Sequence, residues 1–186
     1  MKNKEIIDLL KEGNKKYVSS THSMSHTSLE LRKQTALEGQ NPLAIVIACS
    51  DSRVMPNSIF SADLGSLFVI RVAGNVLDNH QLGSIEYAAA HLNVKLIIML
   101  GHTGCGAIKA AIHGETDGYI KYITDDIEEA IGAEKDDHKA TVLNALHGVN
   151  VIKNAFAEHP EIGGDELEVI GAVYDIVSGE VEFLEG

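Results

Sequence analysis

The two cysteines of the sequence lie in two short polar stretches that each follow an apolar run. Cys49-Ser50-Asp51-Ser52-Arg53 comes directly after Leu43–Ala48, and Gly101-His102-Thr103-Gly104-Cys105-Gly106 comes directly after Leu96–Leu100. In open α/β sheets, binding sites form beyond the carboxyl ends of the strands. If the two apolar runs are neighbouring parallel strands, both cysteines and His102 converge at one edge of the sheet.

These three side chains form a ligand set that suits zinc. Two thiolates and one imidazole are borderline-soft ligands, and the His102-x-x-Cys105 step is short enough for both side chains to reach one ion. The flanking glycines permit the tight turn that this approach needs. A structural zinc site usually has four protein ligands, whereas a catalytic site has three and an open position. Because the sequence has no third cysteine, we predict a catalytic Zn²⁺ held by Cys49, His102 and Cys105.

Asp51 and Arg53 are the predicted catalytic pair beside this ion. Two thiolates cancel the charge of the ion, so lowering the pKa of its bound water toward ~7 needs additional help. An ionised Asp51 can accept a hydrogen bond from the water or hydroxide and orient it, while Arg53 keeps Asp51 ionised and fixes its direction. If Arg53 released it, Asp51 itself could occupy the open position and switch the site off.

Each residue taken alone has a simpler explanation. A cysteine at a strand end is commonly a core residue, Asp51 with Arg53 could form only a loop salt bridge, and His102 could cap the following helix. The conjunction of all five residues at two strand ends favours the metal site. The other histidines lack such a setting, and we expect them at the surface or in packing. Neither a P-loop nor a Gly-x-Gly-x-x-Gly turn after a strand is present, and a cysteine-phosphatase loop would need arginine where Met55 stands.

Apolar periodicity predicts the elements that position these residues. Strands are expected at Leu43–Ala48, Leu67–Val72, Leu96–Leu100, Glu168–Ile176 and, after a turn at Ser178-Gly179, Val181–Leu184. Helices are expected over residues 4–17, 28–38, about 82–92, from about 106, around 120–131 and over 142–156. Gly101 is expected to stop the third strand. Apolar strands that alternate with helices predict βαβ units and a mainly parallel sheet.

Composition narrows the class of protein. The chain has 186 residues, a length that predicts one domain or a domain with a small appendage. Its apolar fraction is ordinary for a globular protein, and its formal net charge is −12 at pH 7. Without a dense Lys/Arg cluster, neither nucleic acid nor an anionic membrane is an expected partner. No stretch is long and apolar enough to span a bilayer, and the first residues do not read as a secretory signal. Two cysteines cannot form a disulfide framework, so we expect a cytoplasmic protein.

The paired motifs resemble the β-class carbonic anhydrases. The resemblance is carried by Ala48–Val54, Phe68–Asn75, Gly83–Ala88, Gly101–Gly106 and Gly171–Asp175. It covers residues 40–112 strongly and the C-terminal strands moderately. Relatives often have Asp-Gln-Gly after the phenylalanine that matches Phe60, whereas this chain has Ser61-Ala62-Asp63. The missing glutamine bears on substrate positioning and not on the metal site.

The resemblance implies a fold and an assembly. It implies an α/β domain over residues 1–186, with a mainly parallel four-stranded sheet flanked by helices and a fifth, C-terminal strand at the edge. Residues 1–38 would form a helical arm that embraces a neighbouring subunit, and residues 40–186 the α/β core. The expected assembly is therefore a homodimer or a multiple of dimers.

The resemblance also implies an activity. By position, Cys49, His102 and Cys105 match the zinc ligands, and Asp51 with Arg53 matches the catalytic dyad. The expected reaction is the reversible hydration of carbon dioxide to bicarbonate and a proton by a metal-bound hydroxide. The alternatives are hydrolysis of another small molecule such as carbon disulfide, or a zinc- or thiol-based regulatory protein without turnover. A third alternative is a redox switch through a Cys49–Cys105 disulfide, which could coexist with catalysis.

Overall fold

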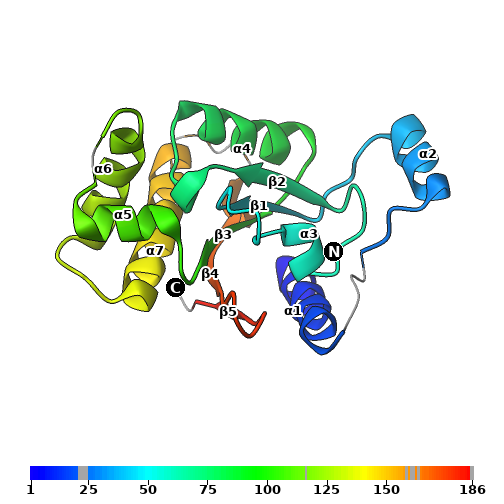
Figure 1. Cartoon of the computed structure of the whole chain (residues 1–186). Coiled ribbons are helices and arrows are strands. Elements are labelled where there is room, and N and C mark those ends of the chain that lie inside the picture. Colours follow the sequence, from blue (N-terminus) through cyan, green and yellow to red (C-terminus); the bar gives the residue numbers. More distant parts are fainter. Residues whose placement is uncertain (21–24, 116, 158, 160–161, 163, 185–186) are drawn as a thin grey trace.

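A five-stranded sheet forms the centre of the molecule (Figure 1). The computed structural model describes residues 1–20, 25–115, 117–157, 159, 162 and 164–184. The strands are β1 (Ala44–Ala48), β2 (Leu67–Arg71), β3 (Leu96–His102), β4 (Glu168–Tyr174) and β5 (Val181–Phe183), in the spatial order β2-β1-β3-β4-β5. The first four strands are parallel and β5 runs antiparallel to β4 at the edge. The predicted α/β class and strand arrangement are confirmed.

Helices cover both faces of the sheet. They are α1 (Asn3–Ser19), α2 (Leu29–Glu38), α3 (Pro56–Ile59), α4 (Asn79–His91), α5 (Gly106–His113), α6 (Ile120–Ile131) and α7 (Asp137–Phe156), with short 3₁₀ turns η1 (Ala73–Asn75) and η2 (Gly164–Glu166). In Figure 1, α4 and α1 lie on opposite sides of the sheet, and α5 and α6 lie beyond one end of it. None of the described helices is both long and apolar enough to cross a membrane.

The central strands are buried on both faces, as their continuous apolar runs predict. In β1, Val46 packs in the cluster that includes α1, while Ile45 and Ile47 pack in the cluster that includes α4 and α7. Every residue of β1 and β3 is buried. The ends of these two adjacent strands therefore give rigid support to the segments that begin at Cys49 and at Thr103.

The prediction that Gly101 stops the third strand is wrong. β3 continues through Gly101 to His102, because β4 pairs with it as far as the His102–Tyr174 match. The missing side chain at Gly101 instead lets α7 approach, since a Cβ there would lie 2.9 Å from Cγ2 of Thr141. His102 consequently belongs to the sheet and not to a loop.

The two N-terminal helices are placed differently. α1 packs on the sheet through Ile6 and Leu10, both buried in the core cluster on that face. By contrast, α2 has no buried residue and projects from the body at the right of Figure 1. Within the N-terminal segment, α1 therefore packs against the core of this chain, whereas no residue of α2 is buried in it.

Candidate metal centre

The structure brings the three predicted metal ligands together at one edge of the sheet. Cys49 follows β1, His102 ends β3, and Cys105 is the residue that precedes α5. Because β1 and β3 are neighbours, the ligand atoms of all three lie within 4.8 Å of one another, and all three residues are buried. The sequence predicted that the cysteines and His102 would converge if the two apolar runs formed neighbouring parallel strands. β1 and β3 are such a pair.

The ring of His102 is held in one tautomer. Its Nδ1 lies 3.0 Å from the carbonyl oxygen of Thr103, and a carbonyl can only accept, so Nδ1 carries the proton. Nε2 then keeps its lone pair. That atom is buried without a hydrogen-bond partner among the described residues, a costly state unless something else binds it. A cation at the cluster would fill this need.

The two sulfurs form an unequal pair. The Sγ atoms of Cys49 and Cys105 lie 4.0 Å apart, and the Cys49 sulfur also accepts from the backbone amides of Asp51 and Gly74. The hydrogen bond from Cys105, together with these two amides, lowers the pKa of Cys49 to about 4 against the effect of burial. The same hydrogen bond together with burial raises the pKa of Cys105. Both shifts come from the same contact between the sulfurs, and a divalent cation bound to both sulfurs would displace a thiol proton.

This donor set fits Zn²⁺. Both cysteines are free, and two thiolates with one imidazole nitrogen are ligands that zinc prefers. Zn–S bonds of about 2.3 Å at tetrahedral angles would separate two sulfurs by about 3.8 Å, close to the observed separation of 4.0 Å. The fit thus rests on ligand chemistry, on spacing and on the unpartnered nitrogen of His102.

Asp51 and Arg53 form a bidentate ion pair beside the cluster. Arg53 donates from Nε to Oδ1 of Asp51 at 2.9 Å and from Nη2 to Oδ2 at 2.7 Å, and its backbone amide adds a third bond at 3.0 Å. These contacts hold the pKa of Asp51 well below its usual range. With both of its oxygens engaged by Arg53, Asp51 is not a member of the metal-binding cluster in this structure.

Comparisons with known proteins place the chain in a family. The family model for carbonic anhydrase matches residues 44–181. Carbonic anhydrase 2 of Mycobacterium tuberculosis is 35% identical over 181 residues, which cover 91% of this chain and 87% of that protein. The structure of the Coccomyxa β-carbonic anhydrase matches with a TM-score of 0.68 at 26% identity, over 98% of this chain and 82% of that one. The chain belongs to the β-carbonic anhydrase family.

Another solved β-carbonic anhydrase supports the same placement. A structure from Sordaria macrospora, described as tetrameric, matches with a TM-score of 0.69 at 28% identity over 85% of this chain and 88% of that chain. The chain is an enzyme of this family, and its Cys49 and His102 stand at the ends of the adjacent strands β1 and β3.

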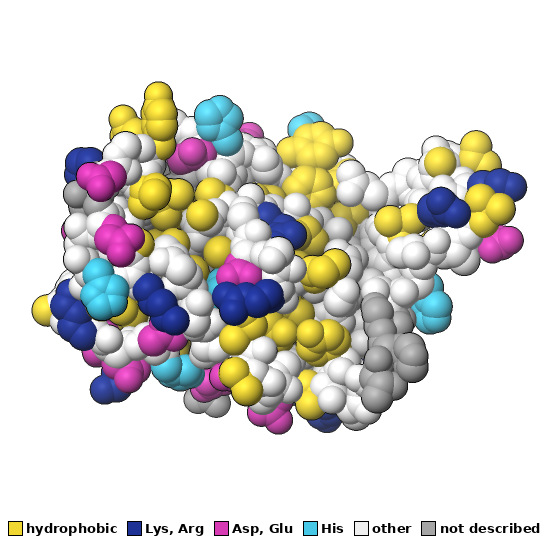
Figure 2. Space-filling view, in the orientation of Figure 1, with side chains coloured by type: hydrophobic (Ala, Val, Ile, Leu, Met, Phe, Trp, Pro, Cys, Tyr) yellow, Lys and Arg dark blue, Asp and Glu magenta, His cyan; other side chains and the backbone are white. Residues whose placement is uncertain are grey.

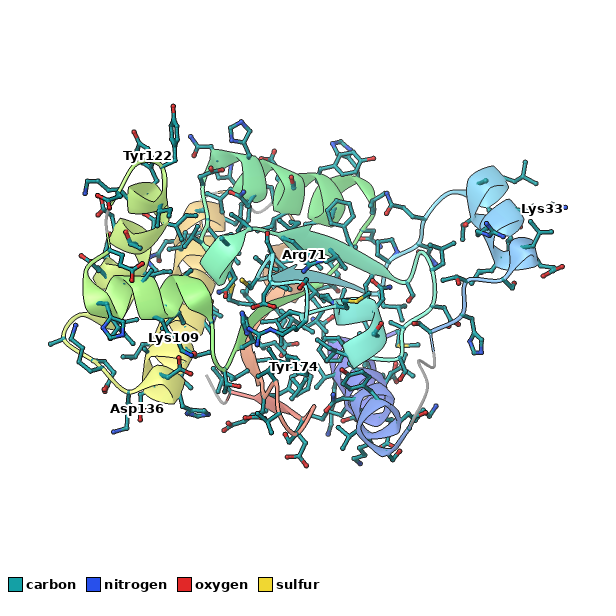
Figure 3. The ribbon with its side chains drawn as sticks, viewed as in Figure 1. Lys33, Arg71, Lys109, Tyr122, Asp136 and Tyr174 are labelled. Carbon is teal, nitrogen blue, oxygen red and sulfur yellow. The ribbon has the colours of Figure 1, made fainter. Side chains whose placement is uncertain are left out.

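Arg71 is a site residue of this β-carbonic anhydrase that the sequence did not single out. It is the last residue of β2, in register with Ala48 of β1, and it is labelled in Figure 3. Its Nε donates to the carbonyl oxygen of Cys49 at 3.1 Å, and its Nη2 donates to that of Asp51 at 2.6 Å. The signal that could have found it was a charged residue that ends an apolar strand next to the site.

Glycine is required at two positions of the metal centre. Gly104, inside the His102–Cys105 turn, has a φ of +67°, and Gly74 has a φ of +64°, a region that other residues enter at a cost. At Gly74 a Cβ would also lie 2.7 Å from Cδ1 of Ile127. This close packing holds the Gly74 amide 3.3 Å from the Cys49 sulfur.

Proposed function

We propose that this chain catalyses the reversible hydration of carbon dioxide to bicarbonate and a proton, with Zn²⁺ held by Cys49, His102 and Cys105. The observation that carries the proposal is the convergence of two sulfurs and an unpartnered imidazole nitrogen within 4.8 Å. Three ligands are the number typical of a catalytic zinc site. The Asp51–Arg53 pair beside the ligands and the family membership support the same reaction.

The chain's own residues would position the attacking water. When bound, zinc supplies a Lewis acid that lowers the pKa of water so that a nucleophile forms near neutral pH. A carboxylate has about four lone-pair sites, so Asp51 can accept from the water while it accepts from Arg53. Arg53 fixes the side chain of Asp51, and Arg71 fixes its backbone. The low pKa of Asp51 means that it orients the water without retaining the released proton, which passes to buffer.

Stopped-flow hydration of carbon dioxide against pH, with metal analysis on the same sample, tests the proposal. We expect one zinc per chain and activity that rises from neutral to alkaline pH. Cys49→Ser and His102→Ala should each lose zinc and activity together. Acetazolamide, present in the Coccomyxa structure, should inhibit.

Two results would overturn the proposed reaction. Stoichiometric zinc without carbon dioxide hydration would favour a regulatory protein. Turnover of carbon disulfide in its place would favour the hydrolase alternative. Separately, full zinc content in Cys49→Ser would reject the ligand assignment.

We further propose that the chain forms a homodimer or a multiple of dimers, with α2 in the interface. α2 has no buried residue, and Leu29 and Leu37 on it are 51% and 88% exposed. Figure 2 shows hydrophobic and charged side chains together on this projecting part. The tetrameric Sordaria relative supports assembly. Light scattering after gel filtration should give an even multiple of the 20.0 kDa chain mass, and a monomer at micromolar concentration would contradict it.

We propose the cytoplasm as the compartment, because a reducing environment keeps both sulfurs available as ligands. The support is that both cysteines are free and lie in the proposed metal site. Mild oxidation of the purified protein should release zinc, measured with a colorimetric chelator. Retention of zinc during complete thiol oxidation would contradict the assignment of Cys49 and Cys105 as ligands.

A further inference from the structure

Asp137 reaches the metal loop from a distant part of the sequence. It is the first residue of α7, and its Oδ2 accepts a hydrogen bond from the backbone amide of Gly104 at 2.8 Å. Thr141, one turn further on, donates its hydroxyl to the carbonyl oxygen of Asp137 at 2.8 Å and to that of His102 at 3.4 Å. The start of α7 is therefore attached to the loop that carries His102 and Cys105.

The peptide that Asp137 contacts is the one that His102 uses. The amide between Thr103 and Gly104 donates its N–H to Asp137, and the carbonyl of the same peptide accepts from Nδ1 of His102 at 3.0 Å. A continuous path of hydrogen bonds thus runs from a carboxylate through one peptide group to the imidazole. The far end of that imidazole is Nε2, the unpartnered atom of the cluster.

We propose that Asp137 is a positioning residue for the metal centre, which acts on His102 through the Thr103–Gly104 peptide. The inference deepens the proposed function and rests on its metal site. Metal-ligating histidines commonly donate their second N–H to a carboxylate or carbonyl, which fixes the ring and raises its basicity. Here the carbonyl is polarised by a carboxylate at the other end of the same peptide, and such chains strengthen each of their bonds. Asp137 therefore makes the lone pair of Nε2 of His102 more available to a bound metal ion.

Fold stability alone does not explain a charged group at this position. The second oxygen, Oδ1, is inaccessible to solvent and has no partner among the described residues, although Asp137 as a whole is only partly buried. An acceptor atom left without a hydrogen bond costs stability. A neutral amide would accept the same bond from Gly104. The favourable effect of negative charge at a helix N-terminus is already supplied by Asp136, which caps α7 through the amide of Lys139.

Asp136 offers a matched control. It is exposed at the start of α7, as Figure 3 shows, and none of its described hydrogen bonds reaches the metal loop. Asp136→Asn and Asp137→Asn remove the same charge from adjacent residues of the same helix end. Only Asp137→Asn changes the path to His102.

The test measures zinc affinity by competition with a chromophoric chelator, together with the amide proton shift of Gly104 by NMR. We expect Asp137→Asn to weaken zinc binding about tenfold, at the low end of the range for residues that support metal ligands. Its Gly104 amide proton should move upfield, because the acceptor loses its charge. Asp136→Asn should change neither quantity. Asp137→Ala, which removes the acceptor, should weaken zinc binding further.

Urea unfolding of the metal-free proteins separates this role from a structural one. If Asp137→Asn and Asp137→Ala lower stability but bind zinc as the native chain does, Asp137 is structural and the inference is overturned. A Gly104 amide proton without a downfield shift in the native protein would also overturn it, even if neither variant folded. None of these measurements depends on turnover, so loss of the carbon dioxide reaction would contradict the proposed function and leave this inference to be decided by zinc affinity.

Discussion

Arg53 affects both the direction and the pKa of Asp51. The bidentate contact with Arg53 fixes both of its oxygens, and the same contact lowers its pKa. An ordinary aspartate with a pKa near ~3.9 would also be ionised at neutral pH. The gain from Arg53 at that pH therefore lies in the direction of the carboxylate and not in its charge.

Asp51→Ala should separate metal binding from catalysis. The carboxylate is outside the metal-binding cluster, so zinc content should stay at the native level. Loss of a preorganised acceptor for the attacking water should lower kcat for carbon dioxide hydration roughly 10²–10³-fold. Ser52→Ala, at the neighbouring exposed position, is the control and should retain native kcat. Native kcat in Asp51→Ala would remove Asp51 from the mechanism.

Arg53→Ala tests whether direction or ionisation is the contribution of the arginine. Removing Arg53 raises the pKa of Asp51 toward its ordinary value, which is still about three units below pH 7. Asp51 thus stays ionised at pH 7–8, and a fall in activity there reports lost orientation. We expect that fall in a stopped-flow pH series, and we expect that raising the pH does not restore it. Recovery of native activity at alkaline pH would show that Arg53 acts through ionisation.

At the scale of elements, the sequence predicted most of the frame and part of the site. Apolar runs located β1 and β3, and the adjacency of these strands brought Cys49 to His102. The predicted end of β3 was wrong because the length of this strand depends on its pairing with β4. The apolar run of β3 carries no information about that pairing. Asp137 carried no signal, since its contact with Gly104 joins residues 33 positions apart, through a helix packed from outside the motif.

Gly74 links η1, α6 and the metal centre, and Gly74→Ala should disturb all three. A Cβ there would lie 2.7 Å from Cδ1 of Ile127 and 3.1 Å from Cβ of Ala107, at a φ of +64°. We expect urea unfolding to show a loss of roughly 2–5 kcal/mol in the free energy of unfolding, the sum of left-handed strain and overpacking. Zinc occupancy should fall as the amide leaves the Cys49 sulfur.

The control for that variant is Gly114→Ala. Gly114 has a φ of +72°, and no described atom lies within 4 Å of the position that an added Cβ would take. Urea unfolding should therefore show only the backbone cost of about 1–2 kcal/mol. An equal loss in both variants would show that packing against Ile127 does not matter.

Asn14 should anchor α1 to the sheet. Its Nδ2 donates to the carbonyl oxygens of Ile59 and Gly179 in a buried setting, and its Oδ1 accepts from the amide of Val181 in a partly buried one. Asn14→Ala leaves three backbone groups without this partner, so we expect urea unfolding to show a loss of roughly 2–5 kcal/mol. Asn150→Ala, at an exposed position of α7, should be neutral. Equal effects would argue that α1 is held by its apolar face alone.

At the scale of the whole molecule, the metal centre and the main core are separate. The two large apolar clusters lie on the two faces of the sheet and contain none of the three proposed ligands. Cys49 and Cys105 belong to a third, smaller cluster with α5, α6 and the start of α7. The fold can therefore form without the ion, in contrast to small domains that zinc alone holds together.

Removal of zinc by a chelator should accordingly leave a folded but less stable protein. Far-UV circular dichroism should be retained, because the two sheet-face clusters do not include the ligands. Stability in urea should fall by about 4 kcal/mol relative to a sample with free zinc at ~1,000 times Kd, and added zinc should restore it. The difference should shrink as the pH falls, since protons compete with zinc for the Cys49 and Cys105 sulfurs. Loss of the dichroism spectrum on chelation would instead show that the ion is part of the fold, and the separation of core and metal centre would be wrong.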